Sequence, residues 1–188
     1  KPRIVSAALD GTVRVWDPSS REAEAVLTGH EFPVRGVACF VGADGKPRIV
    51  SAGEDKTVRV WNPSSGEEEA VLKGHEGYVN GVACFVGADG KPRIVSASAD
   101  NTVRVWNPSS GEEEAVLEGH EDAVTGVACF VGADGKPRIV SASADNTVRV
   151  WNPSSGEEEA VLEGHEDAVT GVACFVGADG KPRIVSAS

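Results

Sequence analysis

The chain has 188 residues, of which 40% are hydrophobic and 25% charged, and its formal net charge is −11 at pH 7. Such an acidic balance argues against a site that grips nucleic acid or an anionic membrane by charge. No apolar run approaches the roughly 20 residues that a transmembrane helix requires, so we expect no membrane partner.

The sequence is one unit of about 45 residues written repeatedly. Its copies are residues 1–45, 46–90, 91–135 and 136–180, followed by a partial copy, 181–188. The third and fourth copies are identical, which indicates recent amplification or idealisation by design. A unit this small cannot bury a core alone, so the repeats are expected to stack into a single domain over 1–188. Because the sequence begins in mid-repeat and lacks Met, we expect a fragment, a processed product or the ordered part of a longer chain.

Each copy predicts four short strands separated by turns. In chain order the second unit gives Val79–Phe85, Pro92–Ala97, Thr102–Trp106 and Glu113–Leu117. The first three are rich in β-branched or apolar residues, the third alternates with period two, and Asp-Gly or Asn-Pro-Ser-Ser-Gly turns separate them. The fourth begins with glutamates, which suits a solvent-exposed edge where charge prevents further pairing.

The two ends of the chain predict incomplete sets of strands. The start supplies a second, third and fourth strand: Ile4–Ala7, Thr12–Trp16 and Glu24–Leu27. The end supplies a first strand, Val169–Phe175, and another second strand, Pro182–Ala187. No stretch has a helical apolar stripe. Apolar residues on both faces of a strand, such as Ile94 and Val95, favour sheets sandwiched between other sheets. We therefore predict an all-β fold, a β-propeller of four-stranded antiparallel blades.

One cysteine recurs in each complete copy. The four residues are Cys39, Cys84, Cys129 and Cys174, and none has the paired spacing of a zinc site or a disulfide framework. We expect them to behave as small buried hydrophobic residues. Free thiols fit a reducing compartment, so the expected location is cytoplasmic.

Two dipeptides per unit resemble the WD-repeat family of β-propellers. Gly-His occurs at Gly29-His30, Gly74-His75, Gly119-His120 and Gly164-His165. About thirty residues after the first three of these come Trp61, Trp106 and Trp151, each followed by Asn. The first copy, which begins after its Gly-His position, has the full Trp-Asp at Trp16-Asp17. The resemblance covers the whole chain, and the Asp-to-Asn departure changes only a turn residue.

The resemblance implies a buried hydrogen-bond relay of His, Ser, Asp and Trp in each blade. Residues carried over by position are His30, Ser51, Asp55 and Trp61; His75, Ser96, Asp100 and Trp106; His120, Ser141, Asp145 and Trp151. Across the chain ends the set would be His165, Ser6, Asp10 and Trp16. Serine four residues before the aspartate is constant, which favours Ser51 over Gly53 as the member. A catalytic triad needs an exposed nucleophile in a cleft, so we expect no enzyme activity, metal or cofactor.

The copies differ mainly at the turn between the second and third strands and around the Gly-His loop. In the WD-repeat family these two loops share one face of the disc. We predict that this face binds a protein or peptide partner, with apolar anchors at Leu9, Phe32 and Tyr78. The expected contact residues are Leu9, Gly11, Phe32, Pro33, Arg35, Glu54, Lys56, Lys73, Tyr78 and Asn80.

The resemblance therefore implies a non-catalytic scaffold for protein–protein interaction. The alternative is a self-assembling structural module without a heterologous ligand. Four blades closing alone would need about 90° between blades, against about 45° in an eight-bladed ring. The resemblance implies the strand lengths and large Trp of a family whose rings usually have about seven blades, and so a wedge angle too shallow for four. Two chains closing into one ring are therefore expected. In that homodimer Ile4–Ala7 would hold the second-strand position and Lys181–Ser188 would be displaced.

Overall fold

The computed structural model describes residues 2–188, which contain seventeen strands and no helix. Sheet 1 has three strands: β1 (Ile4–Ala7), β2 (Thr12–Asp17) and β3 (Glu22–Thr28). Sheet 2 comprises β4 (Val34–Val41), β5 (Pro47–Gly53), β6 (Thr57–Trp61) and β7 (Glu68–Lys73). Sheet 3 comprises β8 (Val79–Val86), β9 (Pro92–Ser98), β10 (Val103–Trp106) and β11 (Glu113–Leu117). Sheet 4 comprises β12 (Val124–Val131), β13 (Pro137–Ser143), β14 (Val148–Trp151) and β15 (Glu158–Leu162), and sheet 5 comprises β16 (Gly171–Val176) and β17 (Pro182–Ala187).

Every sheet is an antiparallel meander in which strands adjacent in sequence are adjacent in space. The turn between β4 and β5 shows why. Gly45 takes φ of +75°, Gly42 N–H donates to the Lys46 carbonyl at 2.8 Å, and the Asp44 carboxylate accepts from Lys46 N–H at 3.0 Å. These are the residues that a tight turn requires, and they recur in each copy.

The hydrophobic core lies between sheets. Ile49 and Trp61 of sheet 2 pack with Val13, Val15 and Leu27 of sheet 1. The opposite face of sheet 2, including Val50 and Val58, packs with Val79, Ile94 and Trp106 of sheet 3. Each inner sheet is thus apolar on both faces, and one sheet cannot be stable without its neighbours.

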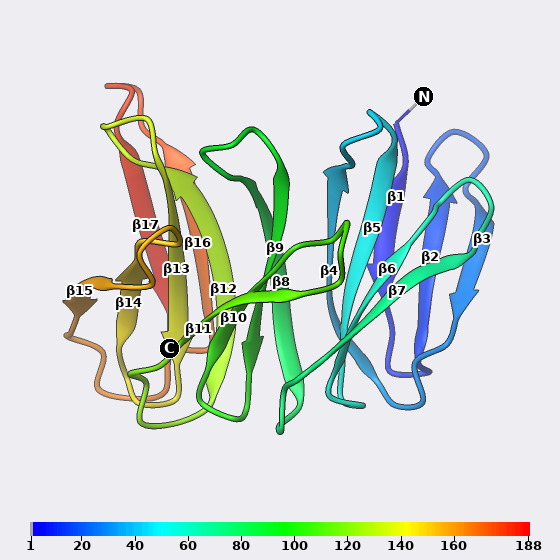
Figure 1. The fold of residues 1–188 in the computed structure, drawn as a ribbon. Coiled ribbons are helices and arrows are strands. Elements are labelled where there is room, and N and C mark those ends of the chain that lie inside the picture. The colour runs from blue at the N-terminus through cyan, green and yellow to red at the C-terminus, as the bar shows by residue number, and fades with distance from the viewer. Residues whose placement is uncertain (1) are drawn as a thin grey trace.

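The sheets fan out from their first strands, which lie side by side (Figure 1). The closest approach occurs at glycines: a Cβ on Gly36 would lie 3.2 Å from Gly81 Cα, and one on Gly81 would lie 3.6 Å from Gly126 Cα. The absence of a side chain at these positions allows the inner strands to pack backbone against backbone.

This arrangement confirms the prediction of an all-β fold built from four-stranded antiparallel sheets and is that of a partial propeller. Three sheets are complete, while sheets 1 and 5 each lack strands. The chain described over residues 2–188 contains no helix that is long and apolar enough to cross a membrane.

The displacement of Lys181–Ser188 was predicted for a two-chain ring and stays a prediction, because the structure describes one chain, in which this segment remains on its own neighbouring strand. β17 pairs with β16 from Gly171↔Ala187 to Val176↔Pro182, and β1 pairs only with β2. The physical reason is proximity, because the short turn that begins at Gly177 joins β17 to β16 in the same chain, with Gly177 N–H donating to the Lys181 carbonyl at 2.8 Å.

The prediction that all four cysteines are buried is wrong. Cys39 is exposed, and Cys84, Cys129 and Cys174 are partly buried. Cys84 packs into the core between sheets 2 and 3, where burial raises the pKa of its thiol to about 12. Cys39 lines a cleft of about 250 Å³ beside sheet 1, because sheet 1 has no strand equivalent to β4 that could cover it.

Candidate functional site

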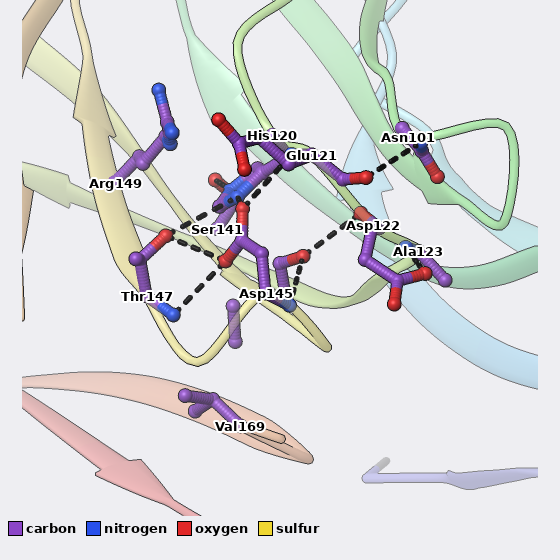
Figure 2. Close-up of polar contacts among 12 residues, drawn as sticks. Asn101, His120, Glu121, Asp122, Ala123, Ser141, Asp145, Thr147, Arg149 and Val169 are labelled. Carbon is purple, nitrogen blue, oxygen red and sulfur yellow. Dashed lines mark hydrogen bonds and ion pairs between the residues drawn. The ribbon is translucent and has the colours of Figure 1, made fainter. Parts of the chain in front are cut away.

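The three complete sheets each bring one His, Ser, Asp and Trp together. In sheet 3, His75 Nδ1 lies 2.8 Å from Asp100 Oδ2, and His75 Nε2 lies 2.7 Å from Ser96 Oγ, which also accepts a hydrogen bond from Trp106 Nε1 at 2.8 Å. The same three contacts occur for His30, Ser51, Asp55 and Trp61 and for His120, Ser141, Asp145 and Trp151. Figure 2 shows His120 between Ser141 and Asp145.

The partners fix where the protons lie. Asp100 also accepts from Thr102 Oγ1–H at 2.6 Å and from Glu76 N–H at 2.9 Å, so it is an acceptor throughout and His75 donates its Nδ1–H. Nε2 then accepts from the Ser96 hydroxyl. Burial lowers the pKa of His75, an effect that the neighbouring Asp100 only partly opposes, and the ring is therefore neutral.

The aspartate of the relay is held in its ionised form. Burial alone would raise the pKa of Asp100, but the hydrogen bonds from Thr102, His75 and Glu76 N–H outweigh it, and the net pKa is lowered. The Ser96 hydroxyl is fully buried and donates to His75 while accepting from Trp106. The Ser96 hydroxyl is thus fully engaged by His75 and Trp106, and the Asp100 carboxylate is bonded to His75, Thr102 and Glu76 N–H. These bonds tie the Gly-His loop to the turn between the second and third strands.

In the three complete sheets the glycine before the histidine lies against the arginine and tryptophan of that sheet, whereas a Cβ on Gly164 would meet nothing within 4 Å. A Cβ on Gly74 would lie 2.8 Å from Arg104 Nη1 and 3.1 Å from Trp106 Cη2. The loop can therefore cross the edge of the tryptophan ring only where no side chain is present. This close approach accounts for the constancy of the Gly-His dipeptide.

The fourth predicted set is not assembled within this chain. His165 Nε2 lies 2.7 Å from Ser186 Oγ, and His165 Nδ1 lies 3.0 Å from Ser188 Oγ, instead of meeting Ser6 and Asp10. At the other end Trp16 Nε1 donates to Ser6 Oγ at 2.8 Å, with no histidine present to complete the set. Asp10 instead accepts from Thr12 N–H at 3.0 Å and Thr12 Oγ1–H at 2.6 Å. The reason is again that β17 occupies the position beside β16.

The Gly-His loop and the turn between the second and third strands of each complete sheet are joined directly. Glu54 N–H donates to the Pro33 carbonyl at 2.9 Å, and Ala99 N–H donates to the Tyr78 carbonyl at 2.8 Å. The two loops that vary among the copies therefore form one surface. Six of the ten predicted contact residues are exposed on it: Leu9, Phe32, Arg35, Lys56, Lys73 and Tyr78. We refer to these six as the variable face.

The other four predicted contact residues are used inside the structure. Gly11 is buried, and Pro33 is half-buried. The Glu54 carboxylate pairs with Arg35, whose Nε lies 2.6 Å away. Asn80 Nδ2 donates to the Val124 carbonyl of the next sheet at 2.9 Å.

Asn80 therefore joins two sheets, a role that sequence reasoning missed. Its counterpart Thr125 does the same, donating from Oγ1 to the Val169 carbonyl at 2.5 Å. The sequence feature that could have indicated this role is that both residues carry a short side chain with a hydrogen-bond donor.

Part of the sequence difference among the copies reflects the geometry of the turn between the second and third strands. Gly11, Lys56 and Asn101 occupy equivalent positions and all take positive φ, of 78°, 66° and 68°. Glycine and asparagine suit this region, whereas lysine is disfavoured there. Asn101 Nδ2 also donates to the Glu121 carbonyl at 3.3 Å, joining the turn of sheet 3 to the Gly-His loop of sheet 4 (Figure 2).

The glutamate runs of the outer strands are paired to arginines. Arg59 Nη1 contacts Glu68 Oε2 at 2.5 Å, and Arg48 contacts both Glu69 and Asp44. These runs therefore form internal ion pairs at a partly exposed rim. Within residues 2–188, no group of three or more His, Cys, Asp or Glu side chains is placed to hold a metal ion.

Comparison with known proteins gives one family. The model of the WD domain, G-beta repeat, matches four segments, residues 1–17, 21–62, 66–107 and 111–152. Comparison with curated proteins gave no match.

Proposed function

Because the chain belongs to the WD-repeat family, we propose that it is a non-catalytic scaffold that binds a protein or peptide through the variable face. One observation carries the proposal: the copy-specific residues include the large exposed side chains of Leu9, Phe32 and Tyr78, which are 70%, 55% and 52% exposed. The relay of the three complete sheets, by contrast, has the same four residue types in each. Aromatic side chains exposed on a rigid support are favourable anchors for a partner.

The non-catalytic part of the proposal is supported by the relay chemistry. Ser96 and His75 have the residue types of a nucleophile and its base, but both are buried and already bonded. Three copies of one hydrogen-bonded set serve folding better than catalysis, because each connects loops of its own sheet.

The test is selection of binders from a displayed peptide library, followed by measurement of their affinity for Phe32→Ala and Tyr78→Ala. We expect at least one of the two substitutions to weaken binding tenfold or more. Val41→Ala is the matched control, since Val41 is 61% exposed but lies at the opposite end of its strand from the variable loops. A partner that binds both aromatic variants as tightly as the original chain would contradict the proposal.

Self-assembly is the second candidate, favoured by the state of the two chain ends. Leu27, Leu72 and Leu117 are each 1% exposed because each packs on the tryptophan of the next sheet. The equivalent Leu162 is 41% exposed, and Trp16 is only half-buried, whereas the other three tryptophans are 1% exposed. We propose that two chains close head to tail into one eight-bladed homodimeric ring, in which Trp16 of a second copy covers Leu162.

Closure of this ring requires a choice between two strands. β16 can accept either β17 of its own chain or β1 of a second copy, and the single chain uses β17. Removing residues 181–188 should therefore favour the ring, because β16 would then be free for β1 and His165 for Ser6. Light scattering gives the mass: a single-chain mass for both the full chain and the shortened one would rule out the ring.

A further inference from the structure

A cleft of about 360 Å³ lies between sheets 2 and 3 on the side of the variable face. It is formed by the turn between β5 and β6, the first residues of β6 and the segment that leads from β7 into the next Gly-His loop. Its lining includes Lys56, Lys73 and Arg59, together with Glu31 and Asp55. Three cationic side chains therefore face two carboxylates in a chain that is acidic as a whole.

The cationic side chains are not equivalent. Arg59 pairs with Glu68 at 2.5 Å and approaches Asp55 Oδ2 at 3.4 Å, and Asp55 itself is held by His30. Lys56 and Lys73 are exposed, and neither ammonium group has an ion-pair partner among residues 2–188. The two lysines thus supply the unneutralised charge of the cleft.

The next copy provides a comparison within the same chain. There the equivalents of Lys56 and Lys73 are Asn101 and Glu118, while the arginine and both carboxylates are retained as Arg104, Glu76 and Asp100. The cleft with Lys56 and Lys73 is therefore basic, whereas the equivalent residues of the next copy are acidic. Among the charged lining residues, these two positions alone account for the difference.

Backbone geometry adds an independent observation. Lys56 has φ of 66°, a conformation that is unfavourable for a residue with a Cβ and that Gly11 and Asn101 adopt more easily. Lysine also lacks the carbonyl bond that Asn101 makes to the following loop. A residue that is unfavourable for the turn itself is explained if its ammonium group has a use.

We propose that this cleft binds an anionic group of an acidic peptide segment, with Lys56 and Lys73 as its direct contacts. The proposal rests on the proposed function, since it names the chemistry of the partner that the variable face would recognise. Charge-assisted hydrogen bonds from two ammonium groups suit a carboxylate or a phosphate oxygen.

The experiment measures fluorescence anisotropy of labelled peptides with the full chain. Hexaglutamate tests carboxylates, a hexapeptide of glycine and phosphoserine tests phosphates, and hexaglutamine is the neutral control. We expect at least one anionic peptide to bind more tightly than hexaglutamine, with affinity falling as salt is raised. The double substitution Lys56→Asn and Lys73→Glu, which gives the cleft the residue types of the next copy, should weaken that binding tenfold or more.

The reverse exchange serves as the matched control. Asn101→Lys with Glu118→Lys should create a second cleft of the same charge and raise the number of peptides bound per chain from one to two. Unchanged affinity after the first exchange, or binding no tighter than that of hexaglutamine, would overturn the proposal. If selected partners still depend on Phe32 or Tyr78 in that case, the scaffold function stands and only the assignment of the cleft fails.

Discussion

Replacing Ser96 with alanine gives the most direct test of the relay. The Ser96 hydroxyl is fully buried, receives Trp106 Nε1–H at 2.8 Å and meets His75 Nε2 at 2.7 Å. Alanine would leave the indole N–H and the imidazole nitrogen unpaired in the core. Each buried polar group left without a partner costs about 1–3 kcal/mol, so we expect a loss of about 2–5 kcal/mol in the free energy of unfolding.

Ser98→Ala is the matched control for this prediction. Ser98 lies on the same strand and is equally buried, but its hydroxyl accepts one hydrogen bond, from Asp100 N–H at 3.2 Å. The first copy has Ala8 at this position, so we expect a loss below about 1 kcal/mol. Urea denaturation followed by tryptophan fluorescence gives the two free energies, and hydrogen exchange locates the opening in sheet 3. Equal losses in the two variants would refute the relay as the cause.

Three further predictions concern the turn, the histidines and the thiols. Lys56→Asn should raise the free energy of unfolding, measured with urea, by about 0.5–1 kcal/mol, because asparagine tolerates the φ of 66° better than lysine. An unchanged free energy of unfolding would contradict this prediction. Burial holds the pKa of His75 and its two counterparts below 6.5, so as pH falls below about 6.5 the unfolded chain takes up protons first. The thermal midpoint should therefore fall progressively from pH 6.5 down to the folded-state pKa; a midpoint independent of pH over this range would argue against neutral buried rings. Maleimide should modify Cys39 faster than Cys84 or Cys129, as peptide mass spectrometry would reveal, and in the proposed two-chain ring the rate at Cys39 should drop as protein concentration rises.

The sheet architecture was predictable because the information is local and repeated. Val79–Phe85 and Glu113–Leu117 are predicted as strands and are observed as β8 (Val79–Val86) and β11 (Glu113–Leu117). Strand propensity, alternation and turn residues agree in each copy, and several copies reduce the chance of a wrong assignment. Gly-His and Trp spacing then identified the family.

The remaining details depend on contacts between copies, which spacing within a copy does not reveal. Asn80 varies as a surface residue does, yet its amide joins sheets 3 and 4. Cys39 has the same neighbours in sequence as Cys84 but differs in exposure, because only Cys39 follows an incomplete sheet. The pairing of β17 with β16 likewise follows from tethering within one chain, which the residue pattern treats as equivalent to pairing with β1.

The glycine contacts between inner strands determine the shape of any assembly that this sequence can form. From sheet 2 onward, successive sheets meet at the same kind of contact, Gly36 with Gly81, Gly81 with Gly126 and Gly126 with Gly171. In the proposed ring, a small change in the separation at this contact would recur at each such junction between sheets. The size of the proposed ring would therefore depend on the sum of these contacts, which are close because the glycines have no side chain.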